Sequence, residues 1–519
     1  MQNKLLNLFR IFCYMEEKMQ TIMKNIKLKL IKNKYNIFIY LGMLFFSLVI
    51  CTNFIRTHFA LDTYCVYAYD STKLITNFLL SNRLISALAI WISNMLKIPF
   101  FINMKILTIL GIIFLTISWF ILYKFIIKIN NKQTDILYNL LIAGISYIII
   151  FNFCTVEYLV FWESAVMCLG ILFTTISSCI FNTDIKYKNF IVLFILFLGS
   201  ICYQGAITLF IPLSLVLILY KQKENIKTII FETIKTGIIY VIVMVINLLA
   251  IKIFGNILNY EVRKTTILSI PDMFNTIIKM GYDMVTKTFG IGPKYWYLLL
   301  IIVITLIFLA YVFKQKKFKI SILEYIVLFI CCVLIPIVPM LATPIESQYM
   351  ETRMAISFGS SIGIILLFVN LYLNKLSVLK YLTSIIIFIM VLVNSVYFIY
   401  ASNENIVTND LDKNIAKLVI EEISNYQMQT NIKIENIGLI FDKNPMSQYD
   451  GHRWLGVINT RSMGTEWSAI ETIELYSGEK FNKVEVPENV KQTFSQKDWN
   501  NFNEEQLIFD GNNLYLCLY

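Results

Sequence analysis

The sequence predicts a mostly α-helical, polytopic membrane protein with a small α+β domain at its C-terminal end. Of its 519 residues, 57% are hydrophobic and the mean hydropathy is +0.66, whereas soluble domains hold roughly 45–50% apolar residues. Apolar runs recur at about 20 residues, the length that a bilayer-spanning helix needs. From about residue 402 the sequence becomes polar and acidic, which predicts a separate domain outside the bilayer.

Eleven apolar runs are expected to cross the membrane. They are residues 36–55, 105–127, 136–153, 158–181, 189–203, 205–220, 233–254, 296–313, 321–341, 355–373 and 380–400. The neighbouring runs 189–203 and 205–220 meet at Tyr203-Gln204-Gly205 and are short for two full spans. Two spans, a pair of half-helices and a re-entrant hairpin all stay open for this region.

Basic residues in the connections predict which side each one faces. Lys and Arg gather in residues 4–34 and in five later connections that fall on the same side, and positive charge in short loops marks the cytoplasmic face. We therefore expect a cytoplasmic N-terminal segment (1–35), a transmembrane domain (36–401) and, after eleven crossings of the plasma membrane, an extracytoplasmic domain (402–519).

The charge of the chain is unevenly divided between these parts. Residues 402–519 carry 10 basic and 18 acidic side chains, whereas the rest carries 35 basic and 16 acidic ones. The basic excess suits anionic lipid headgroups, and nothing in the pattern indicates nucleic acid as a partner. In the last domain the pattern predicts a helix over 410–428, a strand over 437–441, a helix over 466–476 and a hairpin over 507–519.

The long connections all fall on the predicted outer side, so chemistry is expected there. They are residues 56–104, 255–295 and 342–354, whereas the inner connections are short and basic. Within the first, residues 83–98 predict a helix that lies in the membrane plane with Trp91 at headgroup depth.

Two acidic residues follow the first span. Asp62, in Ala60-Leu61-Asp62-Thr63-Tyr64, is placed to act as a general base that deprotonates an acceptor hydroxyl. The alternative is that Asp62 caps the following helix. Asp70 is either a second acid of the site or a solvated surface residue.

Two arginines are candidates to bind a phosphate. Arg83 begins the predicted in-plane helix, and Arg353 precedes the tenth span. A guanidinium group binds phosphate oxygens in a bidentate manner, which suits a lipid phosphate leaving group. The alternative for each is an interfacial side chain that reaches toward the headgroups.

Further polar residues lie at span ends among aromatic ones. Glu157 and Glu163 border the fourth span beside Tyr158 and Trp162, a combination that suits sugar binding; the alternative for Glu163 is a buried ion pair with an arginine. Tyr203 and Gln204 lie at the break between two apolar runs, where they either line a cavity or bond between helices.

Several enzyme classes are excluded by missing motifs. The sequence contains no P-loop, no H-E-x-x-H, no G-x-S-x-G and no dinucleotide-binding fingerprint. An outward-facing enzyme without a nucleotide site needs an activated donor, and a sugar on polyprenyl phosphate fits this requirement. No cofactor is indicated with certainty, and dependence on a divalent cation stays open.

Four short motifs resemble a known family. Asp62-Thr63-Tyr64, Ser81-Asn82-Arg83, Cys202-Tyr203-Gln204 and Glu351-Thr352-Arg353, in this order over residues 36–400, resemble the bacterial glucosyltransferase type II membrane family of the GT-C superfamily. The resemblance implies a GT-C helical bundle in the bacterial plasma membrane, with Asp62 as the catalytic base. Such families often carry two adjacent acids in the first outer loop, whereas here Thr63 follows Asp62.

These observations together predict an inverting glycosyltransferase. It would move a hexose, by the resemblance glucose, from polyprenyl phosphate to a cell-surface glycan such as O-antigen or teichoic acid. Asp62 would be catalytic, and Arg83, Arg353, Tyr203, Gln204, Glu163, Glu157 and Asp70 would contact the substrates. A flippase or transporter of lipid-linked saccharides is the main alternative, and a membrane scaffold or sensor is a third.

Overall fold

The computed structural model describes residues 34–130, 136–221, 226–260, 268–287, 296–315, 318–345, 348–372, 377–452 and 455–519. The chain divides into two units, Met1–Val49 and Ile50–Tyr519. Helix α2 (Lys34–Ile50) falls in the first unit apart from its last residue. Apart from α2, all elements named below belong to the second unit.

Helices occupy the predicted spans. Among the described residues, each predicted range holds a helix, listed here in order: α2, α6 (Phe100–Asn130), α7 (Ile136–Ile150), α9 (Ser164–Phe181), α10 (Lys188–Cys202), α11 (Phe210–Lys221), α12 (Ile226–Leu258), α14 (Trp296–Gln315), α15 (Phe318–Leu334), α17 (Ser361–Tyr372) and α18 (Ser377–Thr430). Five of the described segments are long and apolar enough to cross a membrane, or six if α7 and α8 (Phe153–Val160), bent by 56°, form one span. These helices indicate a membrane protein, whereas eleven crossings stay a prediction.

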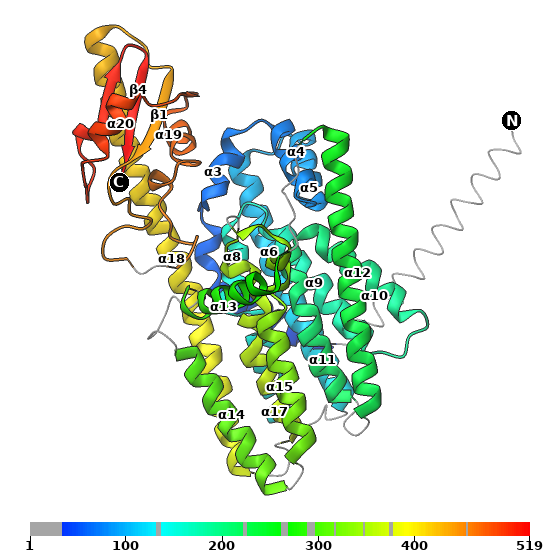
Figure 1. The fold of residues 1–519 in the computed structure, drawn as a ribbon. Coiled ribbons are helices and arrows are strands. Elements are labelled where there is room, and N and C mark those ends of the chain that lie inside the picture. Colours follow the sequence, from blue (N-terminus) through cyan, green and yellow to red (C-terminus); the bar gives the residue numbers. More distant parts are fainter. Residues whose placement is uncertain are drawn as a thin grey trace, which may run out of the picture. The chain divides into compact units, whose positions relative to one another are not determined.

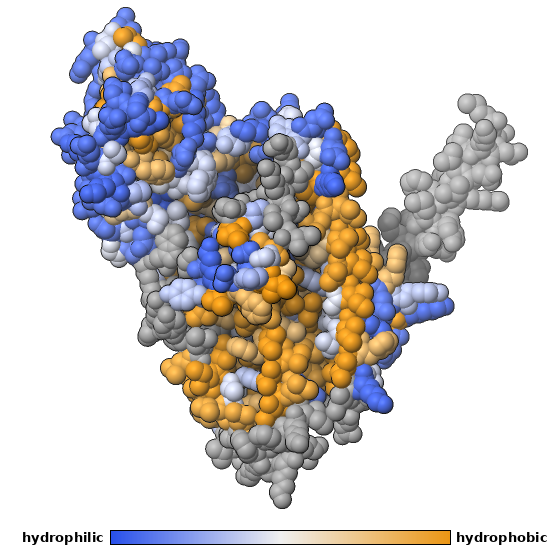
Figure 2. Space-filling model, viewed as in Figure 1, coloured by the Kyte–Doolittle hydropathy of each residue, from blue (hydrophilic) through white to orange (hydrophobic). Residues whose placement is uncertain are grey.

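Hydrophobic side chains cover the outward surfaces of α12, α14 and α15, and hydrophilic ones cover the C-terminal sheet (Figure 2).

Helix α9 packs between α6 and α10 and buries small residues. At Gly170 an added Cβ would lie 3.1 Å from the Ala206 Cβ and 3.3 Å from the Gly199 carbonyl oxygen. Small residues allow this close approach of helices where both sides are apolar.

The first predicted outer connection is helical over most of its length. It contains η1 (Thr52–Ile55), α3 (Leu61–Ala68), α4 (Ser71–Leu80) and α5 (Leu84–Met95). Helix α5 confirms a helix in the range 83–98, and its Trp91 is 54% exposed. Asp70 caps α4, because its Oδ1 accepts a hydrogen bond of 2.8 Å from the Lys73 amide.

The other two predicted connections also contain helices. The range 255–295 holds α13 (Ile270–Lys287), while its residues 261–267 and 288–295 lie outside the described chain. Around 342–354 the chain forms η3 (Val338–Ala342) and η5 (Thr352–Met354), followed by α16 (Ile356–Gly359).

The C-terminal part is an α+β fold built on the end of α18 (Figure 1). Helix α18 runs through residue 402 without a break for 54 residues, about 80 Å at 1.5 Å per residue. The sheet has the order β2-β1-β4-β3, with β1 (Asn436–Phe441), β2 (Asn482–Lys483), β3 (Leu507–Asp510) and β4 (Asn513–Leu518). The remaining elements are η7 (Ser462–Gly464), α19 (Ala469–Ser477), α20 (Glu488–Phe494) and η8 (Glu504–Gln506).

The predicted strand 437–441, helix 466–476 and terminal hairpin 507–519 correspond to β1, α19 and the antiparallel pair β3–β4. The predicted helix 410–428 is the last part of α18. The central pairing, β1 parallel to β4, joins strands more than seventy residues apart. The core between helix and sheet contains Ile415, Val419 and Ile423 from α18.

Candidate functional site

Arg83 is held by a buried carboxylate from another helix. Its Nη1 donates to Glu163 Oε1 at 2.5 Å, and Ser86 Oγ donates to Glu163 Oε2, also at 2.5 Å. Glu163 is the residue that precedes α9, whereas Arg83 and Ser86 lie at the start of α5. Both oxygens of Glu163 are therefore occupied, which agrees with the buried ion pair considered from the sequence.

Arg353 is held in the same way by Glu157 of α8. The Arg353 Nη1 donates to Glu157 Oε1 at 2.5 Å, and the Arg353 backbone amide donates to Glu157 Oε2 at 2.7 Å. Tyr158 Oη donates to the Arg353 carbonyl oxygen at 2.9 Å, and the guanidinium lies 4.6 Å from the centre of the Phe161 ring. Glu351 approaches the same Nη1 to 3.9 Å.

Tyr203, between α10 and η2 (Gln204–Leu209), lies between the two arginines. The centre of its ring is 5.1 Å from the Arg83 guanidinium carbon. The same ring packs edge-on against Tyr158, which hydrogen-bonds Arg353. Gln204 Nε2 donates to the Ser81 carbonyl oxygen at 2.8 Å. The Tyr-Gln pair thus supports the Ser81-Asn82-Arg83 turn, where the Asn82 side chain also hydrogen-bonds Asn247 of α12.

Asp62 lies in the first turn of α3 and is exposed. Within the described ranges, its carboxylate has no hydrogen bond or ion pair. It does not cap α3, because Ala60 holds the capping position. A carboxylate without a partner can accept a proton from a substrate hydroxyl.

The charges of this group act on one another. Burial alone would lower the pKa of Arg83, but Glu163, Tyr203 and Asp62 raise it above its ordinary value. Burial likewise opposes the charge of Arg353, yet Glu157, Tyr203, Glu351 and Asp62 hold its pKa well above the ordinary value. Asp62 therefore lies near enough to both arginines for its charge to stabilise theirs.

Helix α3 is fastened to the C-terminal part of the chain. The Asn409 side chain of α18 accepts from the Phe59 amide at 2.7 Å and donates to the Phe59 carbonyl oxygen at 3.1 Å. Asn405 Nδ2 donates to the same carbonyl oxygen at 3.0 Å. Cys65 Sγ donates to the Trp467 carbonyl oxygen at 3.0 Å. These contacts fix the segment that carries Asp62.

The structure brings most of the predicted site residues together. The ion pairs Arg83–Glu163 and Arg353–Glu157 are linked through Tyr203 and Tyr158. Asp62 acts on both arginines through its charge, and Gln204 supports the turn before Arg83. Asp70 instead makes the cap of α4. The two glutamates are buried and bind the arginines, so here they orient arginine side chains.

Sequence reasoning missed Ser86, Tyr158 and Phe161 as supports of the arginines. The signal for two of them was present. The aromatic residues beside Glu157 and Glu163 were predicted to take part in sugar binding, whereas Phe161 and Tyr158 contact Arg353. Nothing in the sequence pointed to Ser86.

No group of three or more His, Cys, Asp or Glu side chains is placed to hold a metal ion among the described residues.

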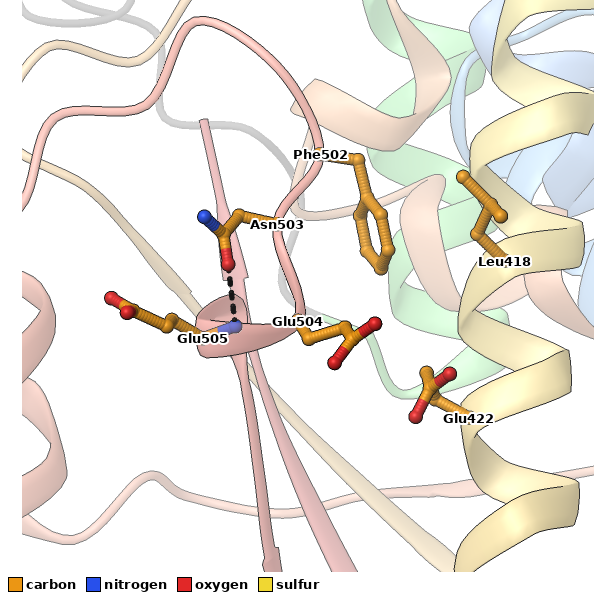
Figure 3. Close-up of a pocket in the computed structure, with 6 residues that line it drawn as sticks. All are labelled: Leu418, Glu422, Phe502, Asn503, Glu504 and Glu505. Atoms are coloured by element: carbon orange, nitrogen blue, oxygen red, sulfur yellow. Dashed lines mark hydrogen bonds between the residues drawn. The ribbon is translucent and has the colours of Figure 1, made fainter.

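A hollow of about 510 Å³ lies between α18 and η8, lined by Leu418, Glu422, Phe502, Asn503, Glu504 and Glu505 (Figure 3). None of the predicted site residues lines it, and three of its six side chains are acidic. We assign it no role in the candidate site.

Comparison with known protein families, with curated proteins and with solved structures found no match to this chain.

Proposed function

We propose that the protein is a membrane glycosyltransferase that moves a hexose from polyprenyl phosphate to a cell-surface glycan on the outer face of the plasma membrane. The observation that carries this proposal is the exposed carboxylate of Asp62, which acts through its charge on two arginines that buried glutamates hold in fixed orientations. The resemblance of four short motifs to the glucosyltransferase type II family supports glucose as the hexose.

In the proposed reaction, an acceptor hydroxyl oxygen attacks the anomeric carbon of the donor sugar. The bond between this carbon and the phosphate oxygen breaks, and its electron pair leaves with the phosphate. Asp62 takes the proton of the attacking hydroxyl. Attack from the face opposite the phosphate inverts the anomeric configuration.

Arg353 and Arg83 would bind the oxygens of the leaving phosphate. Each guanidinium has five N–H donors, and the structure commits Nη1 of each to a glutamate. Because each arginine–glutamate pair is neutral overall, we expect recognition to depend on the remaining oriented donors rather than on net positive charge. In this proposal Glu157 and Glu163 are positioning residues.

The test compares three versions of the gene in a strain from which the gene has been deleted. Wild type should restore a hexose to the surface glycan, as measured by mass spectrometry, and Asp62→Asn should not, since a general base contributes about 10²–10⁴-fold to rate. Asp510→Asn, a change at an exposed hairpin residue, is the matched control and should restore it fully.

Transfer by Asp62→Asn at the wild-type rate would remove the assigned base. Loss of the hexose from the glycan of the deletion strain, together with accumulation of the lipid-linked sugar on the cytoplasmic leaflet, would instead identify a flippase.

A further inference from the structure

Helix α13 presents an apolar stripe that no described residue covers. Ile270, Phe274, Ile278 and Tyr282 are spaced four residues apart and are 72%, 64%, 68% and 57% exposed. Residues at this spacing share one side of a helix. The stripe is therefore continuous over the length of α13, and large exposed apolar patches mark an interaction surface.

The opposite side of α13 is already occupied by protein. Met280 and Met284 are fully buried, and the helix packs on α15 and η3. Asn275 and Lys279 are exposed between the stripe and this packed side. Helix α13 thus has three sides: one packed, one polar and exposed, and one apolar and exposed.

The surroundings of α13 indicate what covers the stripe. The helix runs across the ends of α14 and α15 rather than along them (Figure 1), at the edge of the hydrophobic surface that those helices form (Figure 2). The apolar side chains on the outer side of α15 are exposed as well: Leu323, Ile326, Val327 and Ile330. An apolar stripe on a helix that crosses the ends of such helices is in the position of an interfacial helix.

We propose that α13 lies in the membrane–water interface, with Ile270, Phe274, Ile278 and Tyr282 inserted among the acyl chains of bilayer lipids. The partner is the lipid bilayer rather than a protein, because α13 lies at the ends of apolar helices whose outer sides are exposed and because Lys279 and Tyr282 have the charged and amphipathic character of interfacial residues. The proposal does not depend on the proposed enzymatic activity.

This helix is also connected to the segment that carries Arg353. Thr276 Oγ1 of α13 donates to Gln348 Oε1 at 3.0 Å, and both side chains are buried. Gln348 Nε2 in turn donates to the carbonyl oxygens of Met340 and Thr343 at 3.1 and 3.0 Å. If lipids hold α13, these hydrogen bonds also fix the depth of Gln348, five residues before Arg353, relative to the membrane surface.

The test places a fluorescent amino acid, acridonylalanine, at single positions of the full-length protein in nanodiscs. Phosphatidylcholine brominated on its acyl chains is the quencher. The label at Phe274 should be quenched at least roughly twofold more than the label at Lys279, since an interfacial helix buries its apolar side about 5–10 Å into the bilayer. The same label at Ile278 provides a second position if the first variant is not monodisperse.

Equal quenching at Phe274 and Lys279 would overturn the proposal. Absence of quenching at Phe274 and Ile278 would overturn it too, including the case in which the stripe is protected by a second copy of the chain, which sedimentation of the same sample would reveal.

Discussion

At the scale of single residues, the two arginines of the candidate site depend on carboxylates that come from distant parts of the sequence. Glu163 lies 80 residues after Arg83, and Glu157 lies 196 residues before Arg353. Both glutamates are nearly or fully buried. Removing one partner of a buried pair leaves the other charge without compensation, which costs more than the pair itself contributes.

We expect Glu163→Ala to lower the free energy of unfolding by about 3–5 kcal/mol. Glu488→Ala, which removes the exposed partner of Lys491, is the control and should change it by about 0–1 kcal/mol. Denaturant unfolding in detergent micelles measures both. The double variant Glu163→Leu/Arg83→Met should have a higher free energy of unfolding than Glu163→Leu alone, because it leaves no unpaired charge. A lower free energy of unfolding in the double variant would show that the ion pair is not the source of the effect.

The sequence allowed the candidate residues to be named but not to be paired. Asp62, Arg83, Arg353, Tyr203 and Gln204 were found from their place near predicted span ends. Which glutamate meets which arginine depends on how α5, α8 and α9 pack, and this packing leaves no local signal. The Asn82–Asn247 bond was missed for the same reason.

At the scale of elements, α3 is supported by its contact with α19. Tyr69 Oη donates to Glu471 Oε1 at 3.4 Å, and Lys480 Nζ donates to the Ala68 carbonyl oxygen at 2.8 Å. Burial raises the pKa of Glu471 above its ordinary value. Ionisation of the Glu471 carboxyl therefore costs more free energy in the folded state than in the unfolded state.

This shift predicts a pH dependence with a definite sign. Because the folded pKa of Glu471 is raised, the folded state binds the proton more tightly than the unfolded state does. Stability therefore falls as pH rises from about 4.3, the unfolded pKa, through the raised folded pKa. Glu471→Gln should melt at a higher temperature than wild type at pH 7 and show little difference near pH 4, as followed by thermal unfolding in detergent. A lower melting temperature at pH 7 would contradict this.

Helix α18 shows where sequence patterns mislead about element boundaries. The change from apolar to polar composition near residue 402 indicates a domain limit, and α18 continues through it to Thr430. Helical propensity does not depend on whether the outer residues face lipid or water, so a change of surroundings need not end a helix. The helix over 410–428 was predicted correctly because the helical period persists there, and it places Ile415, Val419 and Ile423 in the core.

At the scale of the whole second unit, hydrogen bonds connect the C-terminal fold to the segment that carries Asp62. Asn409 bonds both backbone groups of Phe59, three residues before Asp62, so the segment that bears Asp62 is braced by α18. The hydrophobic composition predicted a membrane protein with an outer α+β part. It gave no indication that this part holds the candidate base in place, because the contact joins residues 350 positions apart.

Asn409→Ala removes both of these bonds, each of which contributes about 0.5–1.5 kcal/mol. We expect faster hydrogen–deuterium exchange over residues 58–69 and a lower initial rate of hexose transfer, with the protein still folded. Asn425→Ala, which removes only a local contact with Glu422 on the same helix, should change neither. Unchanged exchange in Asn409→Ala would show that α3 is held by other contacts.

The unbroken course of α18 limits how far the C-terminal fold can reach. A continuous helix of 54 residues keeps the sheet at a constant distance from the apolar part of the same helix, so the C-terminal fold cannot follow a long polymer away from the membrane. If the chain acts on surface glycans, we expect it to modify them while they are still short or at the end nearest their lipid, and the added sugars should be densest there.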